Sequence, residues 1–180
     1  MSKKTKYKQL CEAYQKGVEE CDQYRKACRE FVVDLRGTLL ETFQCPETKI
    51  FMFPPTHGFV FKSSRIQGDA YDTEFADNGV ALIGFAINAN LDSHDDKFFT
   101  FIVTFKKTQE KITCQILDDD KEFSNADDGL VDFCEHIFKL AHKNLSERLK
   151  VFLQSPDEES APIGFRVQNE SGTQPVSKKP

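Results

Sequence analysis

The sequence has no long hydrophobic run. The longest, residues 80–87, is far shorter than the ~20 apolar residues that a membrane-spanning helix requires. The first residues, Met-Ser-Lys-Lys, carry no apolar stretch of the kind found in a secretory signal peptide. These absences predict a soluble, cytoplasmic protein without a membrane partner.

Tryptophan is absent and the net charge is only −5, whereas phenylalanine occurs 17 times. A phenylalanine-rich chain of 180 residues is long enough to bury one hydrophobic core without disulfides or metals. Binding to a phosphate backbone needs a basic face, and the acids between Glu12 and Glu30 dilute the lysines near the N-terminus. The composition therefore argues against nucleic-acid binding.

Short motifs that assemble a catalytic or metal centre are also absent. The chain has no Cys-x-x-Cys, Gly-x-Ser-x-Gly, Gly-x-x-x-x-Gly-Lys or His-Glu-x-x-His. The acidic run that begins at Asp118 fails the EF-hand pattern, because Gly129 stands where that pattern needs its closing Glu. We therefore predict no metal and no cofactor.

The strongest positive feature is a periodic stripe within the first forty-odd residues. Its members recur at alternating steps of four and three residues, with one gap at Arg25: Tyr7, Cys11, Tyr14, Val18, Cys21, Cys28, Val32, Leu35 and Leu39. The spacing predicts one helix over residues 3–44, approaching ~60 Å at ~1.5 Å per residue. Such a helix is longer than a small domain is wide, so part of it must overhang the body or meet another chain.

The two halves of this predicted helix differ. After Cys28 apolar residues cover most of the circumference, which indicates burial on several sides. Before that point the apolar stripe is a narrow seam, whose named members are Tyr7, Tyr14, Val18 and Cys21. We predict that this seam contacts a partner protein, or a second copy of the chain in a weak homodimer.

Residues 48–117 show the period-two alternation and the turn signals of an antiparallel sheet. Residues 98–106 and 111–117 alternate apolar and polar side chains on either side of a polar loop, which predicts a hairpin. Residues 49–53 and 59–62 bracket a Pro-Pro turn in the same way. The segment is therefore predicted to form a meander.

A nearly all-apolar run at residues 80–88 predicts a central strand that is buried on both faces. Gly84 and Ala86 fall on the same side of this strand, so we expect a helix to approach closely there. The predicted fold class is α+β: an antiparallel β-meander of about five strands, flanked by a long N-terminal helix and a C-terminal helix.

Ser124 and Asp127 resemble a capping box, which predicts a final helix over residues 126–154. The two helices and the sheet together are expected to form a single domain over residues 1–154.

The remaining segment, residues 155–180, is rich in Ser, Pro, Glu and Gly and is predicted to be a mobile tail. Inside it, residues 163–167 alternate apolar with Gly and Arg. We predict that this insert is a docking strand, which pairs with a sheet edge in cis or in a partner.

Two loops hold residue types found in catalytic sites. Residues 63–78 form a long, acid-rich loop, which is more typical of a solvated connection than of a site. His94 lies beside Asp95 and Asp96, and a His next to carboxylates can act as a general base. One such cluster between two strands is usually turn chemistry, so these three residues are weak catalytic candidates.

An acidic segment precedes the final helix. Its acids suit a helix N-terminus and are expected to be solvated, and they also offer a docking surface for a basic partner: Asp118, Asp119, Asp120 and Glu122.

With no assembled catalytic set, the sequence favours a non-enzymatic, cytosolic protein-interaction module, meaning a regulator, adaptor or chaperone-like protein. It would act through the seam of the long helix and the acidic surface. The alternative is a small-molecule-sensing domain with a pocket lined by Phe59, Phe85 and Phe101. A hydrolase-type enzyme centred on His94 is the third and least supported interpretation.

All six cysteines are predicted to be free thiols. Cys21 and Cys28 are separated by two helical turns, a rise of ~10 Å that a disulfide cannot bridge. Thiol titration of denatured protein that was purified without reductant should find six reactive groups. A stable intramolecular bridge would contradict the cytoplasmic interpretation.

Overall fold

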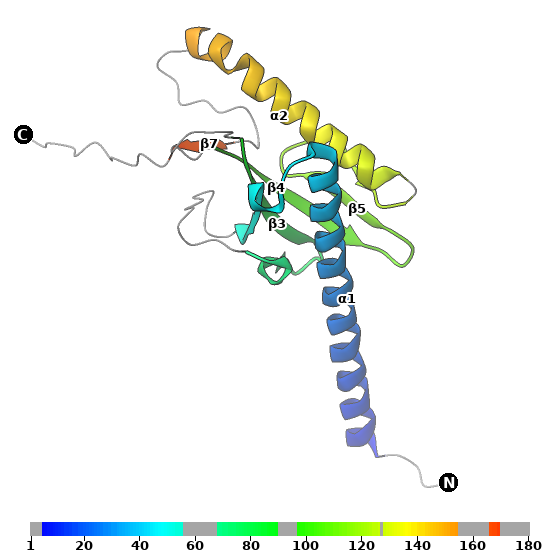
Figure 1. Cartoon of the computed structure of the whole chain (residues 1–180). Coiled ribbons are helices and arrows are strands. Elements are labelled where there is room, and N and C mark those ends of the chain that lie inside the picture. Colours follow the sequence, from blue (N-terminus) through cyan, green and yellow to red (C-terminus); the bar gives the residue numbers. More distant parts are fainter. Residues whose placement is uncertain (1–4, 56–67, 90–96, 127, 155–165, 170–180) are drawn as a thin grey trace, which may run out of the picture.

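The protein is described by a computed structural model, which covers residues 5–55, 68–89, 97–126, 128–154 and 166–169. A long helix, an antiparallel sheet and a second helix follow one another along the chain (Figure 1). The helices are α1 (Lys6–Phe43) and α2 (Gly129–Gln154), and the strands are β1 (Ile50–Phe53), β2 (Glu74–Phe75), β3 (Ala81–Asn88), β4 (Lys97–Lys107), β5 (Ile112–Ile116), β6 (Phe123–Ser124) and β7 (Arg166–Asn169). The predicted α+β class with a meander-like sheet is confirmed.

The sheet is built around two long central strands, β3 and β4, which pair from Ala81 opposite Phe105 to Asn88 opposite Phe98. The strand order is β1-β3-β4-β5-β6, and every pairing is antiparallel. Short strands share the outer edges end to end: β1 and β2 both pair with β3, while β5 and β7 both pair with β4. Two long strands therefore hold the shorter ones in register.

β1 pairs with β3, which lies about thirty residues further along the chain. The second half of the hairpin predicted for β1, residues 59–62, lies outside the described residues. The hairpin predicted between β4 and β5 is confirmed, and Ile112, Cys114 and Ile116 face inward as expected.

Local signals set the ends of α1. Thr5 is extended and its side chain accepts a hydrogen bond from the Lys8 amide, so the helix begins at Lys6 rather than at residue 3. Gln44 adopts a left-handed conformation with φ of 48°, and its amide donates to the carbonyls of Glu41 and Leu40. The predicted helix is therefore correct in kind and slightly too long at both ends.

The two halves of α1 differ as the sequence predicts. All of its buried residues lie in the C-terminal half: Cys28, Phe31, Val32, Leu35 and Leu39. The N-terminal half runs away from the sheet into solvent (Figure 1). The sequence predicts burial on several sides of this C-terminal half, but Val33 is 58% exposed. The buried stripe is therefore narrower than predicted.

Both helices pack on one face of the sheet. The Phe31 ring of α1 lies 5.0 Å from the Phe105 ring of β4, and Phe43 meets Phe138 of α2 at 5.4 Å. Beneath the helices Phe85 and Phe101 are fully buried and stacked, with centroids 5.6 Å apart. Aromatic rings from four elements thus make up much of this core.

Gly84 lies on the opposite face of β3, where the expectation of an approaching helix is wrong. A Cβ at Gly84 would come within 2.4 Å of the ring of Phe53, its cross-strand neighbour on β1. Phe53 forms a second, small cluster with Ala86 and Phe98. The room beside this glycine is therefore filled by a side chain of the sheet itself.

α2 begins at Gly129, three residues later than predicted. Ser124 belongs to the short strand β6, which the sequence analysis missed, and its hydroxyl accepts a hydrogen bond from the Ala126 amide. The other member of the predicted capping box, Asp127, lies outside the described residues. The Ser124 signal thus marks a turn between β6 and α2 rather than the first turn of the helix.

Part of the predicted tail joins the sheet. β7 pairs with residues 97–100 of β4, with Val167 opposite Phe99. The docking strand predicted over residues 163–167 therefore pairs with a sheet edge in cis, but it lies further along the chain, at residues 166–169.

Gly84→Ala should lower the free energy of unfolding by about 1–2 kcal/mol, because the new methyl group must displace the buried Phe53 ring. Gly37→Ala is the matched control. Gly37 lies in α1 with nothing within 4 Å of its Cβ position, so alanine there should stabilise the helix by up to about 1 kcal/mol. Urea denaturation measures both. Equal midpoints for the two variants would contradict this account of the second face.

Candidate protein-interaction site

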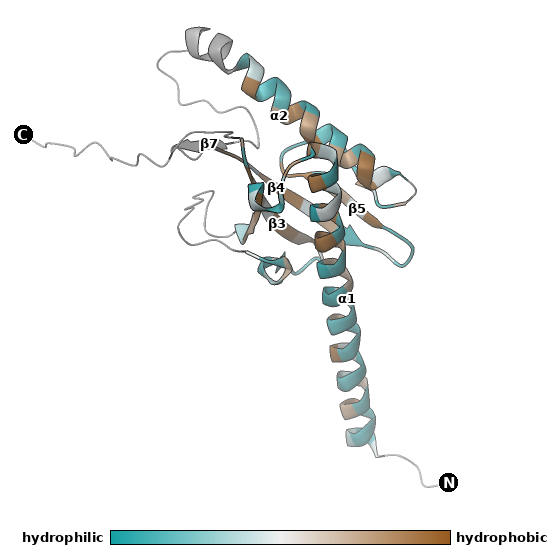
Figure 2. Cartoon of the chain, viewed as in Figure 1, coloured by the Kyte–Doolittle hydropathy of each residue, from teal (hydrophilic) through white to brown (hydrophobic). Residues whose placement is uncertain are grey.

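The N-terminal half of α1 is a free-standing helix. Every residue from Thr5 to Gln23 is exposed. The helical part of this stretch, from Lys6 to Gln23, extends ~27 Å at ~1.5 Å per residue. The overhang that the sequence predicts is therefore present, and most of its residues are hydrophilic, with isolated hydrophobic residues among them (Figure 2).

Tyr24 marks the point at which α1 leaves the body. Its hydroxyl donates to the Gly79 carbonyl at 2.5 Å and accepts from the Lys107 amide at 3.2 Å. Burial raises the pKa of Tyr24, against the opposing effect of the Lys107 amide, so the donating hydroxyl proton is retained. Its ring also makes an edge contact with Phe75 at 6.5 Å.

Two arginines strengthen this junction. The Arg25 guanidinium lies 5.9 Å from the centre of the Phe75 ring, and that of Arg29 lies 4.6 Å from the Tyr71 ring. Together with Tyr24 they tie α1 to the segment around β2. Because a helix is continuous, fixing this turn also fixes the direction of the projecting half.

The predicted seam lies on this projecting half. Tyr7 is 77% exposed, Tyr14 75% and Val18 42%, and Cys21 is exposed as well. The structure adds Leu10, which is 68% exposed and was missed by the sequence analysis. The signal was present, because Leu10 stands three residues after Tyr7 and four before Tyr14, on the same side of a helix.

The charges on the projecting half are of both signs. Lys16 lies 3.6 Å from Glu20, and Arg25 lies 3.7 Å from Asp22. All four side chains are more than half exposed, so these pairs contribute little to stability. The charged side chains are therefore available to pair with a partner along the seam.

The cysteines are all free thiols in the structure, in agreement with the prediction, and they range from buried to exposed, with Cys45 intermediate. Burial raises the pKa of Cys114 and of Cys134 to about 12, and it also raises the pKa of Cys28. Cys11 and Cys21 are exposed on the projecting helix. The thiols that solution reagents can reach most easily are therefore on the α1 arm.

The acidic segment is divided by its contacts. Asp118, Asp120 and Glu122 are exposed, and Asp118 takes a left-handed conformation with φ of 69°. The Asp119 carboxylate is partly buried and lies 2.6 Å from the His136 ring of α2. Asp119 thus ties the segment after β5 to the final helix, while its three neighbours form the solvent-facing acidic surface.

The surroundings of Asp119 favour its charged form. Burial would raise the pKa of this carboxyl, but hydrogen bonds from His136 and from the Lys121 amide, with the nearby positive charges, hold it below its usual value. The Phe123 ring lies 5.2 Å from the His136 ring and carries the Lys121 ammonium 4.6 Å from its centre. The hydrogen bond between Asp119 and His136 is therefore shielded on one side by an aromatic ring.

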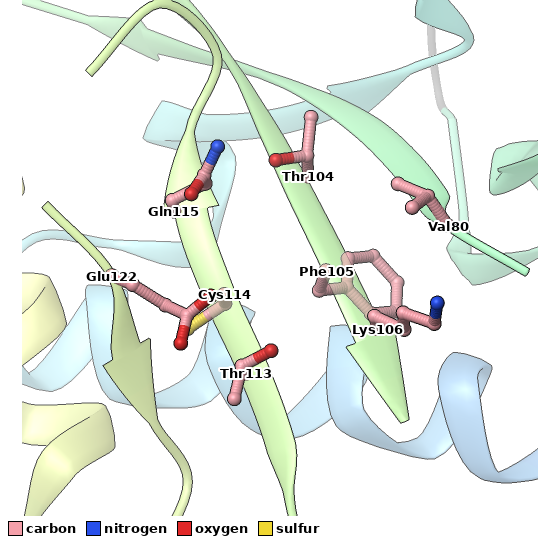
Figure 3. Close-up of a pocket in the computed structure, with 8 residues that line it drawn as sticks. All are labelled: Val80, Thr104, Phe105, Lys106, Thr113, Cys114, Gln115 and Glu122. Atoms are coloured by element: carbon pink, nitrogen blue, oxygen red, sulfur yellow. The ribbon is translucent and has the colours of Figure 1, made fainter. Parts of the chain in front are cut away.

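A shallow groove of about 350 Å³ lies on the sheet face that the helices leave uncovered (Figure 3). Five of its eight lining residues are polar: Thr104, Lys106, Thr113, Gln115 and Glu122. The pocket predicted around Phe59, Phe85 and Phe101 is not at this place. Phe85 and Phe101 are stacked in the core, and Phe59 lies outside the described residues.

The weak catalytic candidates His94, Asp95 and Asp96 lie outside the described residues. In the described part of the loop 63–78, Asp69 and Asp72 cap their own short helical turn. Among the residues that the structure describes, no three metal-ligating side chains lie close enough to hold an ion.

No helix in the described ranges is long and apolar enough to span a bilayer. Comparison with protein-family models, with curated proteins and with solved structures gives no match.

Asp119→Asn should lower the free energy of unfolding by about 1–2 kcal/mol at pH 7, because the charged hydrogen bond to His136 is lost. The folded state lowers the pKa of Asp119, so its stabilisation is fully present above about pH 4 and is lost as the pH falls through the folded-state value. Chemical denaturation at several pH values should therefore show the two proteins converging towards pH 2. Asp120→Asn, on the exposed neighbour, is the control. An equal effect of both substitutions would refute the role of the Asp119–His136 hydrogen bond.

Proposed function

We propose that this protein is a non-enzymatic interaction module, a regulator, adaptor or chaperone-like protein, which binds another protein through the projecting half of α1. The observation that supports this is the exposed seam of Tyr7, Leu10, Tyr14, Val18 and Cys21 on a helix half whose described residues, from Thr5 to Gln23, are all exposed. Apolar side chains regularly spaced on a free helix fit a partner that lays a complementary surface along them.

The energetics favour a moderate affinity. Complete burial of a large apolar side chain contributes ~1.5–3 kcal/mol, but part of this is offset by the entropy lost on association. The seam has few such side chains and lacks the Leu or Ile that stabilises strong coiled coils at each core position. Binding through it is therefore expected to be reversible and dependent on concentration.

The acidic surface of Asp118, Asp120 and Glu122 gives a second, weaker contact region. Its exposed carboxylates would attract a basic partner and mainly increase the rate of association, since exposed charges add little to affinity. The surface follows β5, at the end of the molecule formed by β6 and the start of α2 (Figure 1). It is thus distinct from the α1 seam.

The alternative function, a small-molecule-sensing domain, has less support. Ligand sites usually enclose most of a ligand in a largely apolar cavity. The groove beside Thr104 and Gln115 is open, and five of its eight lining residues are polar. Phe85 and Phe101, two of the residues expected to line a pocket, are stacked in the core.

Deleting residues 1–22 should leave the melting temperature within about 4 °C of the full chain, because the described residues of this part, 5–22, are all exposed. The same deletion should abolish binding through the seam. Tyr14→Asp tests the seam without shortening the helix, and Val33→Asp is the matched control on the same helix, since Val33 is 58% exposed but lies outside the seam.

The measurement is affinity capture from native lysate with mass spectrometry, together with sedimentation of the purified chain. Proteins that bind through the seam should be retained by the full chain and by Val33→Asp, and lost with Tyr14→Asp and with the deletion. The proposal fails if all four proteins capture the same set and the full chain is also monomeric. A large drop in melting temperature on deletion would show that the arm stabilises its own domain.

A further inference from the structure

We propose that the partner of the seam is a second copy of this chain, bound in the antiparallel direction along the projecting half of α1. This inference rests on the proposed interaction function and specifies its occupant. It follows from the order of charged, large and small residues around the seam. Two copies of this surface are complementary only when the helices run in opposite directions.

The seam follows the heptad pattern of a coiled coil. Tyr7, Tyr14 and Cys21 recur every seven residues at d positions, and Cys11 and Val18 do the same at a positions. All five are exposed in the isolated chain. The pattern ends at Arg25, where the body of the domain begins to cover the helix.

Charge selects the direction of pairing. The e positions beside the seam hold Lys8, Gln15 and Asp22, all of them exposed. In a parallel pair an e residue faces a g residue, and the g positions of the arm, Leu10, Gly17 and Tyr24, carry no charge. A parallel pair would therefore have no flanking ion pair.

In an antiparallel pair e faces e. With the two-fold axis level with Lys16, Lys8 lies within two residues, ~3 Å along the axis, of the level of Asp22 of the partner subunit and on the same flank of the seam, and Asp22 lies in the same way beside the partner's Lys8. Gln15 meets the partner's Gln15, so every flanking contact is complementary. Asp22 is 67% exposed and its contact with Arg25 is long, at 3.7 Å, which leaves its carboxylate free to turn towards the partner.

The same register pairs large residues with small ones in the core layers. Tyr14 packs against the partner's Val18, and Cys11 against the partner's Cys21. A parallel pair would instead place Tyr14 against the partner's Tyr14, which separates the helices at that layer. Alternation of large and small side chains across facing positions is what allows two helices to interdigitate.

Gly17 gives an independent observation. It lies in the middle of an exposed helix, where glycine costs about 1 kcal/mol relative to alanine. Apart from the adjoining turns of its own helix, no described residue lies within 4 Å of its Cβ position. The described part of the chain thus offers no structural reason for this glycine. In the antiparallel register Gly17 faces the partner's Gly17 next to the two-fold axis, where the missing side chains let the backbones approach closely.

The length of the free arm fits this register. Tyr7 of the partner subunit comes level with Arg25, so the overlap uses the whole exposed stretch and ends where the body begins. The paired segment is only about two and a half heptads long, which is short for a coiled coil, and the dimer is accordingly expected to form only at high protein concentration.

Cross-linking distinguishes the two directions. In a Cys45→Ser background, the readily accessible thiols are Cys11 and Cys21. A short bismaleimide should convert the full chain to covalent dimer, whereas Cys11→Ser alone or Cys21→Ser alone should give none. An equal mixture of the two variants should again give dimer, joined between Cys11 of one chain and Cys21 of the other, as peptide mass spectrometry would show. Cross-linking within either single variant would overturn the proposal, because only parallel pairing brings like residues together.

Charge reversal tests the register. Lys8→Glu should weaken the dimer about fivefold to tenfold in sedimentation equilibrium, since it places two like-charge pairs in the interface, and Lys8→Glu with Asp22→Lys should restore it. Gln23→Lys, on the outer side of the helix, should change the dimer constant little. Failure of the double variant to recover would refute this register. A chain that is monomeric at all concentrations, but captures another protein through the seam, overturns this proposal and leaves the proposed function standing.

Discussion

The structure depends on the burial of one stripe of α1 against the sheet. Leu35 and Leu39 are fully excluded from solvent, and the Phe31 ring contacts Phe105 of the longest strand. These contacts hold half of a 38-residue helix firmly in place. Since a helix transmits its direction through continuous backbone hydrogen bonds, the anchored half presents the other half to solvent as a straight arm. Tyr24 and the two arginines beside it fix the turn at which this change occurs.

The two faces of the sheet differ in what covers them. One is covered by both helices and is dominated by phenylalanine, while the other combines a small cluster around Phe53 with an open polar groove. The Asp119–His136 pair joins the segment after β5 to α2, and so holds the second helix to the edge of the sheet furthest from β1. The body is therefore a support for α1, and among the described residues three of the four most exposed large apolar side chains, Tyr7, Tyr14 and Leu10, are on its arm.

Elements with strong local signals were predictable. The period of α1 and the alternation of β5 depend on neighbours in the chain, and the predicted bounds of both elements were correct to within a few residues. The strand β6 was not predicted, because a two-residue strand exists only through its pairing with β5. The predicted start of α2 was three residues too early, since Ser124 belongs to this strand. Leu10 was overlooked although its spacing placed it on the seam. The groove and the role of Gly84 depend on which strands lie next to each other in the sheet. No local sequence pattern predicts this order.

The sequence by itself determined the α+β class, the long first helix and the change along it from a narrow apolar seam to a broad one. These follow from residue spacing, which fixes the faces of a helix or strand without reference to the rest of the chain. Only the tertiary structure decided where the body ends on α1, that Phe53 rather than a helix fills the space at Gly84, and that Asp119 is engaged by His136. Each of these three features depends on contacts between residues far apart in sequence. Such contacts are set by how the helices and strands are arranged in space.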